Sequence, residues 1–303
     1  MARTIAQTGK RLTDLLDPQF VARLDALDIF SRKVLQGKLQ GERRSKTRGQ
    51  SVEFADHRPY VVGDDLRFID WNVYGRLDQL FLKLFLEELD LSVHVMIDVS
   101  ASAAFGDPPK EKAIKKLAAA LAYIAMANNS RVTVSCFGEG IRRQLAHMRG
   151  RHYMHQMAEL LLTTDCEGPS DFDRACREVV TGRMGTGVMI VISDFLLKEG
   201  FEDGLRRLVS RNYDLYAIQV LSPQEIDPQV SGDLKLTDME DGDVAEVTIS
   251  RELIKFYKRN LNAYCNDLKQ FCTRRGVQHM LTNSGESMEM LVLNYLRRRG
   301  LVR

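Results

Sequence analysis

The chain has 303 residues, of which 44% are hydrophobic and 28% charged, the balance of a soluble globular protein with one large domain or two. Its formal net charge of +2 excludes strong bulk attraction to nucleic acid or to a membrane surface. The longest apolar run, Leu117–Ala127, is shorter than the roughly 20 residues of a membrane helix, and no signal-peptide pattern precedes it. The five cysteines form no C-x-x-C pair. We therefore expect a cytoplasmic protein with reduced thiols.

Residues 1–49 are predicted to form helices followed by a basic loop. Leucines recur at helical spacing from Leu12, and Pro18 is placed to begin a second helix. The segment Gly37–Gln50 holds five basic residues and three glycines without a periodic apolar face, which predicts a solvated loop. Binding of nucleic acid by this loop is the alternative, although aromatic residues for base stacking are absent from it.

Residues 50–92 form a second segment, in which charged and aromatic residues are closely interleaved. Arginine makes two-pronged bonds to carboxylates, so the density of opposite charges predicts paired, partly buried side chains. An acid–base centre built from Asp64, Asp65 and Asp70 is the less favoured interpretation. Leu80–Glu87 reads as a strand, expected to form a hairpin with the strand that begins at Val93.

Residues 93–303 alternate between strand and helix patterns. This alternation predicts an α/β, doubly wound, mostly parallel sheet with helices on both faces. The stretch 223–249 interrupts it and predicts a β-hairpin excursion with an Asp-Gly turn, a candidate accessory binding surface. The predicted strands after the first are 132–137, 188–193, 215–221 and 277–281, and the predicted helices follow Pro109 and lie near 151–163, 171–181, 201–211, 251–274 and 286–299.

The first strand of this region leads into a cluster of oxygen-bearing side chains. Val93–Ser102 reads V-H-V-M-I-D-V-S-A-S, an apolar strand followed by Asp98, Ser100 and Ser102 at alternate positions. Ligand sites of doubly wound sheets lie beyond the carboxyl ends of central strands. One carboxylate and two hydroxyls suit a hard cation such as Mg²⁺. The alternative is that the serines only cap the next helix.

A second strand, Val188–Ser193, also ends in an acid, Asp194, and a loop between the two strands offers Ser170. The five residues Asp98, Ser100, Ser102, Ser170 and Asp194 resemble the metal-ion-dependent adhesion site of von Willebrand factor A-type domains. Ser170 stands where that family has threonine and keeps the hydroxyl. The resemblance implies one Mg²⁺ or Mn²⁺ ion held by these residues, with an open position for an acidic side chain of a partner protein.

The segment from Ser51 to Arg76 carries a more specific resemblance. Its E-F, R-x-Y and G-D-D-x-R-x-I-D-W motifs, followed by an arginine, resemble the signature of a bacterial family of domains of unknown function, the fifty-eighth in its series. Members of that family are often encoded beside AAA+ ATPases of the MoxR type, so the resemblance implies such an ATPase as a partner.

Together these features predict a non-enzymatic adaptor, with residues 1–49, 50–92 and 93–303 as its three segments. Two other functions stay open. A metal-dependent phosphoester hydrolase would use Asp98 and Asp194, and a nucleic-acid binder would use Gly37–Gln50.

Overall fold

The computed structural model describes residues 12–29, 31, 52–87, 91–182, 187–211, 213–240, 242–297 and 301–302. The chain divides into two compact units. Unit 1 comprises Met1–Gly37 and Leu91–Arg303, and unit 2 comprises Lys38–Asp90. The basic segment Gly37–Gln50 lies outside the described residues, and the predictions made for it stay predictions.

Unit 1 is built on a six-stranded sheet with the order β10-β7-β6-β3-β4-β5. Neighbouring strands are parallel except for β4 and the edge strand β5, which are antiparallel. The strands are β3 (Ser92–Asp98), β4 (Arg131–Phe137), β5 (Ile141–Met148), β6 (Gly187–Ser193), β7 (Asp214–Leu221) and β10 (Gln278–Asn283). The predicted α/β doubly wound fold is confirmed, although the polar edge strand β5 was not predicted.

The central strands are buried on both faces because their side chains alternate between two hydrophobic cores. Val95 and Ile97 of β3 belong to one core, whereas Met96 between them belongs to the other. Ile190 and Val191 of β6 divide in the same way. This alternation is the two-residue period of a strand, and it explains why these segments read as continuous apolar runs.

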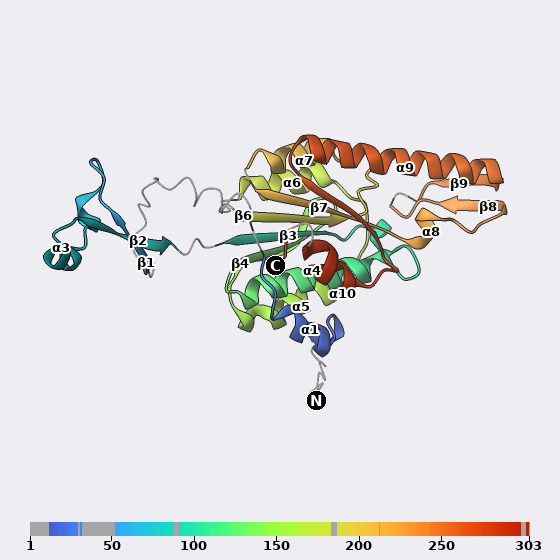
Figure 1. Ribbon diagram of the computed structural model, residues 1–303. Coiled ribbons are helices and arrows are strands. Elements are labelled where there is room, and N and C mark those ends of the chain that lie inside the picture. Colours follow the sequence, from blue (N-terminus) through green and yellow to red (C-terminus); the bar gives the residue numbers. More distant parts are fainter. Residues whose placement is uncertain are drawn as a thin grey trace, which may run out of the picture. The chain divides into compact units, whose positions relative to one another are not determined.

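Helices cover the two faces of the sheet as separate layers (Figure 1). The first layer is centred on α4, whose buried face is rich in alanine and lies directly over β3 and β4. It contains η1 (Leu12–Asp14), α1 (Pro18–Leu24), α4 (Lys110–Ala127), η4 (Arg151–Tyr153), α5 (Met154–Thr163), α10 (Met288–Met290) and the π-helical η5 (Leu291–Leu296). The second layer contains α6 (Phe172–Thr181), α7 (Glu202–Val209) and α9 (Arg251–Arg274). As predicted, Pro18 occupies the first turn of α1.

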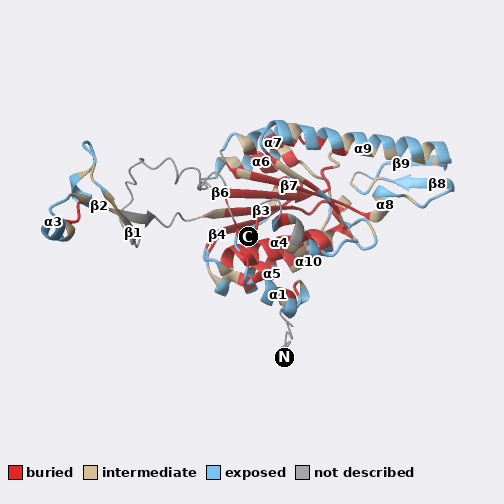
Figure 2. Cartoon of the chain, viewed as in Figure 1, coloured by how far each residue is buried: buried red, intermediate tan, exposed pale blue. Residues whose placement is uncertain are grey.

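The stretch after β7 forms the predicted hairpin. A short helix, α8 (Pro223–Ile226), leads to β8 (Gly232–Thr237), which pairs antiparallel with β9 (Val244–Ile249). Both strands are largely exposed, in contrast to the buried central strands of the sheet (Figure 2). The hairpin therefore contributes little to either hydrophobic core.

The described residues of unit 2 form a two-stranded antiparallel sheet with two short helices. Its elements are β1 (Val52–Pro59), η2 (Leu66–Phe68), α3 (Trp71–Leu77) and β2 (Phe81–Glu87). The predicted hairpin between Leu80–Glu87 and the strand at Val93 is wrong, because β2 pairs with β1 and β3 pairs with β4 and β6. The strand itself was predicted, but its partner lies upstream in the sequence.

Among the residues that the structure describes, no helix combines the length and apolar character needed to cross a membrane.

Candidate functional site

The site lies at the topological switch point of the sheet, where the chain adds strands on opposite sides of β3 and β6. From β3 the chain continues through α4 to β4 on one side, whereas β6 leads to β7 and β10 on the other. β3 and β6 are neighbouring parallel strands, so their carboxyl ends meet at this switch point. Ligands of open α/β sheets bind in the crevice formed there.

Asp98 ends β3 and is 2% exposed. Its Oδ1 accepts hydrogen bonds from the backbone N–H of Ser100 at 2.9 Å and from Ser100 Oγ at 2.7 Å. Its Oδ2 accepts one from Ser193 Oγ at 2.7 Å. Burial and the negative charge of Asp194 raise the pKa of Asp98 to about 6, against the hydrogen bonds that lower it. Ser100 Oγ lies 3.0 Å from Ser102 Oγ, so three of the predicted residues form one chain of polar contacts.

Asp194 follows β6 and is bound by a buried lysine. Lys110, the first residue of α4, is fully buried and places Nζ 2.6 Å from Asp194 Oδ2 and 2.6 Å from Glu225 Oε1. Burial opposes the charged form of Lys110, but the two carboxylates outweigh it and raise the pKa of the ammonium. The second oxygen of Asp194 accepts a hydrogen bond from the backbone N–H of Leu196 at 3.0 Å.

The backbone after β6 turns sharply at Phe195, which has a left-handed φ of 56° and is fully buried. The carbonyl before this turn, that of Asp194, accepts a hydrogen bond from Gln219 Nε2 at 3.0 Å. The carbonyl of Phe195 accepts one from Tyr264 at 2.5 Å. Side chains of β7 and α9 thus hold a conformation that is unfavourable for a bulky residue, and they fix the direction in which Asp194 points.

Ser170 is brought to the site by a loop that runs alongside the end of β3. The carbonyl of Gly168 accepts a hydrogen bond from the Ala101 N–H at 2.8 Å, and the Glu167 N–H donates to Val99 at 3.1 Å. The Oγ of Ser170 is buried, and among the described residues it has no hydrogen-bond partner. A buried hydroxyl without a partner is costly, and this oxygen therefore keeps its full capacity to bind a ligand.

Arg142 of β5 holds the same two loops by their backbone. Its guanidinium donates to the carbonyls of Glu167 at 2.5 Å, Val99 at 3.4 Å and Pro169 at 3.5 Å. The strand that the sequence did not reveal therefore contributes a positioning residue for the loop that carries Ser170.

Glu240 joins the site from the loop between β8 and β9. Its side chain lines one cleft together with Ser102. Burial raises the pKa of Glu240, against the side chain of Ser102 and the backbone N–H of Ser170, which lower it, and the charge of Asp194 adds to the rise. Ser102 and Ser170, which come from different loops, thus both act on one carboxylate.

The arrangement fits a hard divalent cation. Its donors are carboxylate and hydroxyl oxygens, which Mg²⁺ and Mn²⁺ prefer. Within the described residues, Asp98 and Glu240 have no ion pair with lysine or arginine, so their negative charge is uncompensated. The described part of the chain holds no cluster of three or more His, Cys, Asp or Glu side chains placed for a metal ion. A cation here would therefore depend on the serine hydroxyls.

Sequence reasoning missed several residues that shape the site. Ser193 and Lys110 carry no local signal, because a serine in a strand and a lysine at a helix start usually lie in solvent. Glu240 was placed in the hairpin turn, but its contact with Ser102 is long-range. Glu225 alone had a visible signal, since Ser222 and Glu225 form the capping box that their spacing predicts.

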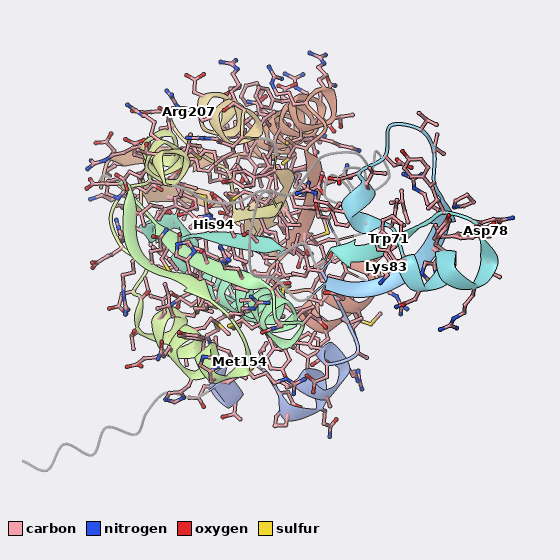
Figure 3. All side chains as sticks on the ribbon, turned by 90° about the vertical axis from the view of Figure 1, so that its left-hand side faces the viewer. Trp71, Asp78, Lys83, His94, Met154 and Arg207 are labelled. Atoms are coloured by element: carbon pink, nitrogen blue, oxygen red, sulfur yellow. The ribbon has the colours of Figure 1, made fainter. Side chains whose placement is uncertain are left out.

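The charged residues of unit 2 are arranged differently. Asp64 accepts two hydrogen bonds from Arg58, at 2.8 and 2.7 Å, and Asp65 accepts hydrogen bonds from the backbone and the guanidinium of Arg67, the shortest at 2.6 Å. Asp70 bonds His57 at 2.9 Å, lies 3.4 Å from Lys83 Nζ and also caps α3. Lys83 is labelled in Figure 3. The prediction of structural pairing is confirmed, and each of the three aspartates has its own partner.

Three relatives of the chain are uncharacterized proteins of Mycobacterium bovis and of two strains of Mycobacterium tuberculosis. Each is 27% identical over 261 residues, covering 84% of this chain and 82% of the relative.

Solved structures with similarity to the chain include the conserved hypothetical protein BatB from Bacteroides thetaiotaomicron, 11% identical with a TM-score of 0.43, covering 69% of this chain and 98% of that one. They also include a von Willebrand factor type A protein from Catenulispora acidiphila, 12% identical with a TM-score of 0.40, covering 73% and 43%. The family model described as "Protein of unknown function DUF58" matches residues 56–267. The chain belongs to the DUF58 family.

Proposed function

We propose that the protein is a non-enzymatic adaptor that binds an acidic side chain of a partner protein through one Mg²⁺ or Mn²⁺ ion. The ion would be held by Asp98, Ser100, Ser102, Ser170 and Asp194, directly or through water. Its positive charge would attract the partner's carboxylate, and binding of this kind needs neither a nucleophile nor a general base.

The buried, unpartnered Oγ of Ser170 is the observation that carries the proposal. Asp98 and Asp194 add negative charge at the same switch point, and Lys110 neutralises only part of it. A dication bound among these oxygens would satisfy the hydroxyl and compensate the charge together.

Calorimetric titration of Mn²⁺ into chelator-treated protein tests the site. We expect saturable binding in the wild type and none in Asp98→Ala.

Ser170→Ala is the sharper variant, because removing an unpartnered hydroxyl should leave the metal-free unfolding temperature unchanged or raise it. The same change should weaken Mn²⁺ binding about 10-fold or more, as loss of a ligand contact does. Ser210→Ala, on the exposed end of α7, is the matched control. If Asp98→Ala and Ser170→Ala both bound Mn²⁺ as tightly as the wild type and the control, the proposal would be contradicted.

A MoxR-type AAA+ ATPase is the partner that we propose to test first, because the resemblance of the charged motif in unit 2 implies it. The expected result is co-purification that requires Mg²⁺ and is lost in Asp98→Ala. Metal-independent association would place the contact elsewhere on the chain.

The hydrolase alternative is tested with the same variants. Metal-dependent turnover of p-nitrophenyl phosphate that disappears in both Asp98→Ala and Asp194→Ala would replace the adaptor proposal by an enzymatic one.

A further inference from the structure

The loop between β8 and β9 reaches back to the oxygen cluster at the ends of β3 and β6. Glu240, in this loop, lines one cleft together with Ser102, and interactions with the Ser102 side chain and the Ser170 backbone N–H lower the pKa of its carboxyl group, against the burial that raises it. Both residues belong to the set predicted to hold the cation. An acidic side chain from the protein's own hairpin thus lies where the adaptor proposal would place the acidic side chain of a partner.

A second contact anchors the loop. Asp238 pairs with Lys198 at 2.9 Å, and Lys198 lies on the loop that follows Asp194. The other oxygen of Asp238 accepts a hydrogen bond from the Glu240 N–H at 2.8 Å. The backbone at Glu240 is therefore tied to the same loop that supplies Asp194, which keeps the Glu240 carboxylate directed at the site.

The hairpin that carries Glu240 is only lightly attached to the rest of unit 1. Its two strands pair with each other and with no other strand, and none of their residues belongs to either hydrophobic core. Displacing the hairpin would break the contacts at its tip and expose only its few partly buried apolar side chains, which is the property of segments that open at low free-energy cost.

We propose that Glu240 is a ligand supplied by the chain itself, which occupies the carboxylate position of the cation site until a partner's acidic side chain displaces it. The inference rests on the proposed function, since it assumes the cation. It assigns the β8–β9 hairpin a regulatory role, because a partner must compete with an intramolecular carboxylate held at high effective concentration.

A cleft beside Glu240 indicates the kind of partner. It has a volume of about 180 Å³ and is lined on its apolar side by Phe105, Leu196 and Met239. Phe105 and Met239 are 42% and 53% exposed. A partner segment with an apolar residue next to its acidic residue could fill the cleft and replace the carboxylate of Glu240, and burial of the apolar residue would favour that exchange.

Mn²⁺ binding followed by water-proton relaxation tests the inference, because the signal reports the water molecules bound to the ion. The variants are Glu240→Gln and the control Glu246→Gln, an exposed residue of β9. In Glu240→Gln we expect Mn²⁺ affinity to fall about 10-fold or more, because losing even an outer-shell partner of a metal site usually costs about 10–100-fold. We also expect a larger relaxation signal per bound ion. Added acetate should lower that signal in Glu240→Gln, where the position is open, and not in the wild type or in Glu246→Gln.

The outcomes separate the two proposals. If the wild type binds no Mn²⁺, the cation site and the inference both fall. If the wild type binds Mn²⁺ and Asp98→Ala does not, but Glu240→Gln matches the wild type in affinity, signal and acetate response, the proposed function stands and the role of Glu240 is refuted.

Discussion

One carboxylate in each unit shows how differently the surroundings can act on an aspartate. In unit 2, Asp64 and Asp70 are bound by cationic or imidazole groups, and the hydrogen bond from His57 lowers the pKa of Asp70 to about 2. In unit 1, burial and a second carboxylate raise the pKa of Asp98 to about 6. Asp70 thus has partners within its own unit, whereas Asp98 has no cationic partner among the described residues, which is why we propose a cation beside it.

The largest expected effect comes from removing the buried ammonium of unit 1. Lys110→Met should leave Asp194 and Glu225 without their shared partner and lower the free energy of unfolding by about 3–5 kcal/mol, the usual cost of breaking a buried ion pair. Urea denaturation followed by circular dichroism measures the loss.

Measuring the unfolding of Lys110→Met and of the wild type with and without Mg²⁺ tests whether Asp194 faces the proposed cation. We expect the ion to stabilise Lys110→Met more than the wild type, because a dication would supply part of the missing positive charge. Equal Mg²⁺ effects in both proteins would show that Asp194 does not face the cation.

A smaller effect is expected for Asp70→Asn in unit 2. The folded pKa of about 2 lies below the ordinary value of 3.8, so the ionised form stabilises the fold above about pH 4 and this contribution is lost as the pH falls towards 2. The variant should therefore be less stable than the wild type at pH 7, and the difference should shrink between pH 4 and pH 2. Hydrogen exchange of the β1 and β2 amides measures it. A difference that does not depend on pH would contradict the role of the charge.

The smallest effect is expected for Arg67→Ala. The Arg67 side chain is 80% exposed, and an ion pair in solvent contributes little because water and salt screen it. The denaturation midpoint of unit 2 should not change measurably. A clear loss of stability would show that exposed pairs in unit 2 also have a structural role.

Much of unit 1 was predictable because its signals are local. Asp98 and Asp194 follow apolar runs that only a strand buried on both faces explains, and the fold then brings their ends together. β5 could not be predicted in this way, because its sequence I-R-R-Q-L-A-H-M is that of an edge strand with mixed polarity. The pairing of β2 was predicted wrongly because alternation reveals a strand but not its neighbour.

The remaining gaps concern contacts between distant parts of the sequence. Lys110 and Asp194 are 84 positions apart, and a single sequence contains no pattern that couples them. The same is true of Glu240 and Ser102. Ser170 was predicted through the resemblance, but the absence of a partner for its hydroxyl among the described residues became visible only in the structure.

The three backbone bonds of Arg142 have a consequence for the thermodynamics of binding. They hold the loop of Ser170 and the end of β3 together through the protein's own contacts. The proposed ion would not have to order these loops, so little conformational entropy would be lost on its binding. The affinity of the proposed site should therefore respond to changes in the edge strand, at a residue whose side chain donates to the loops' backbone and to none of the predicted ligands.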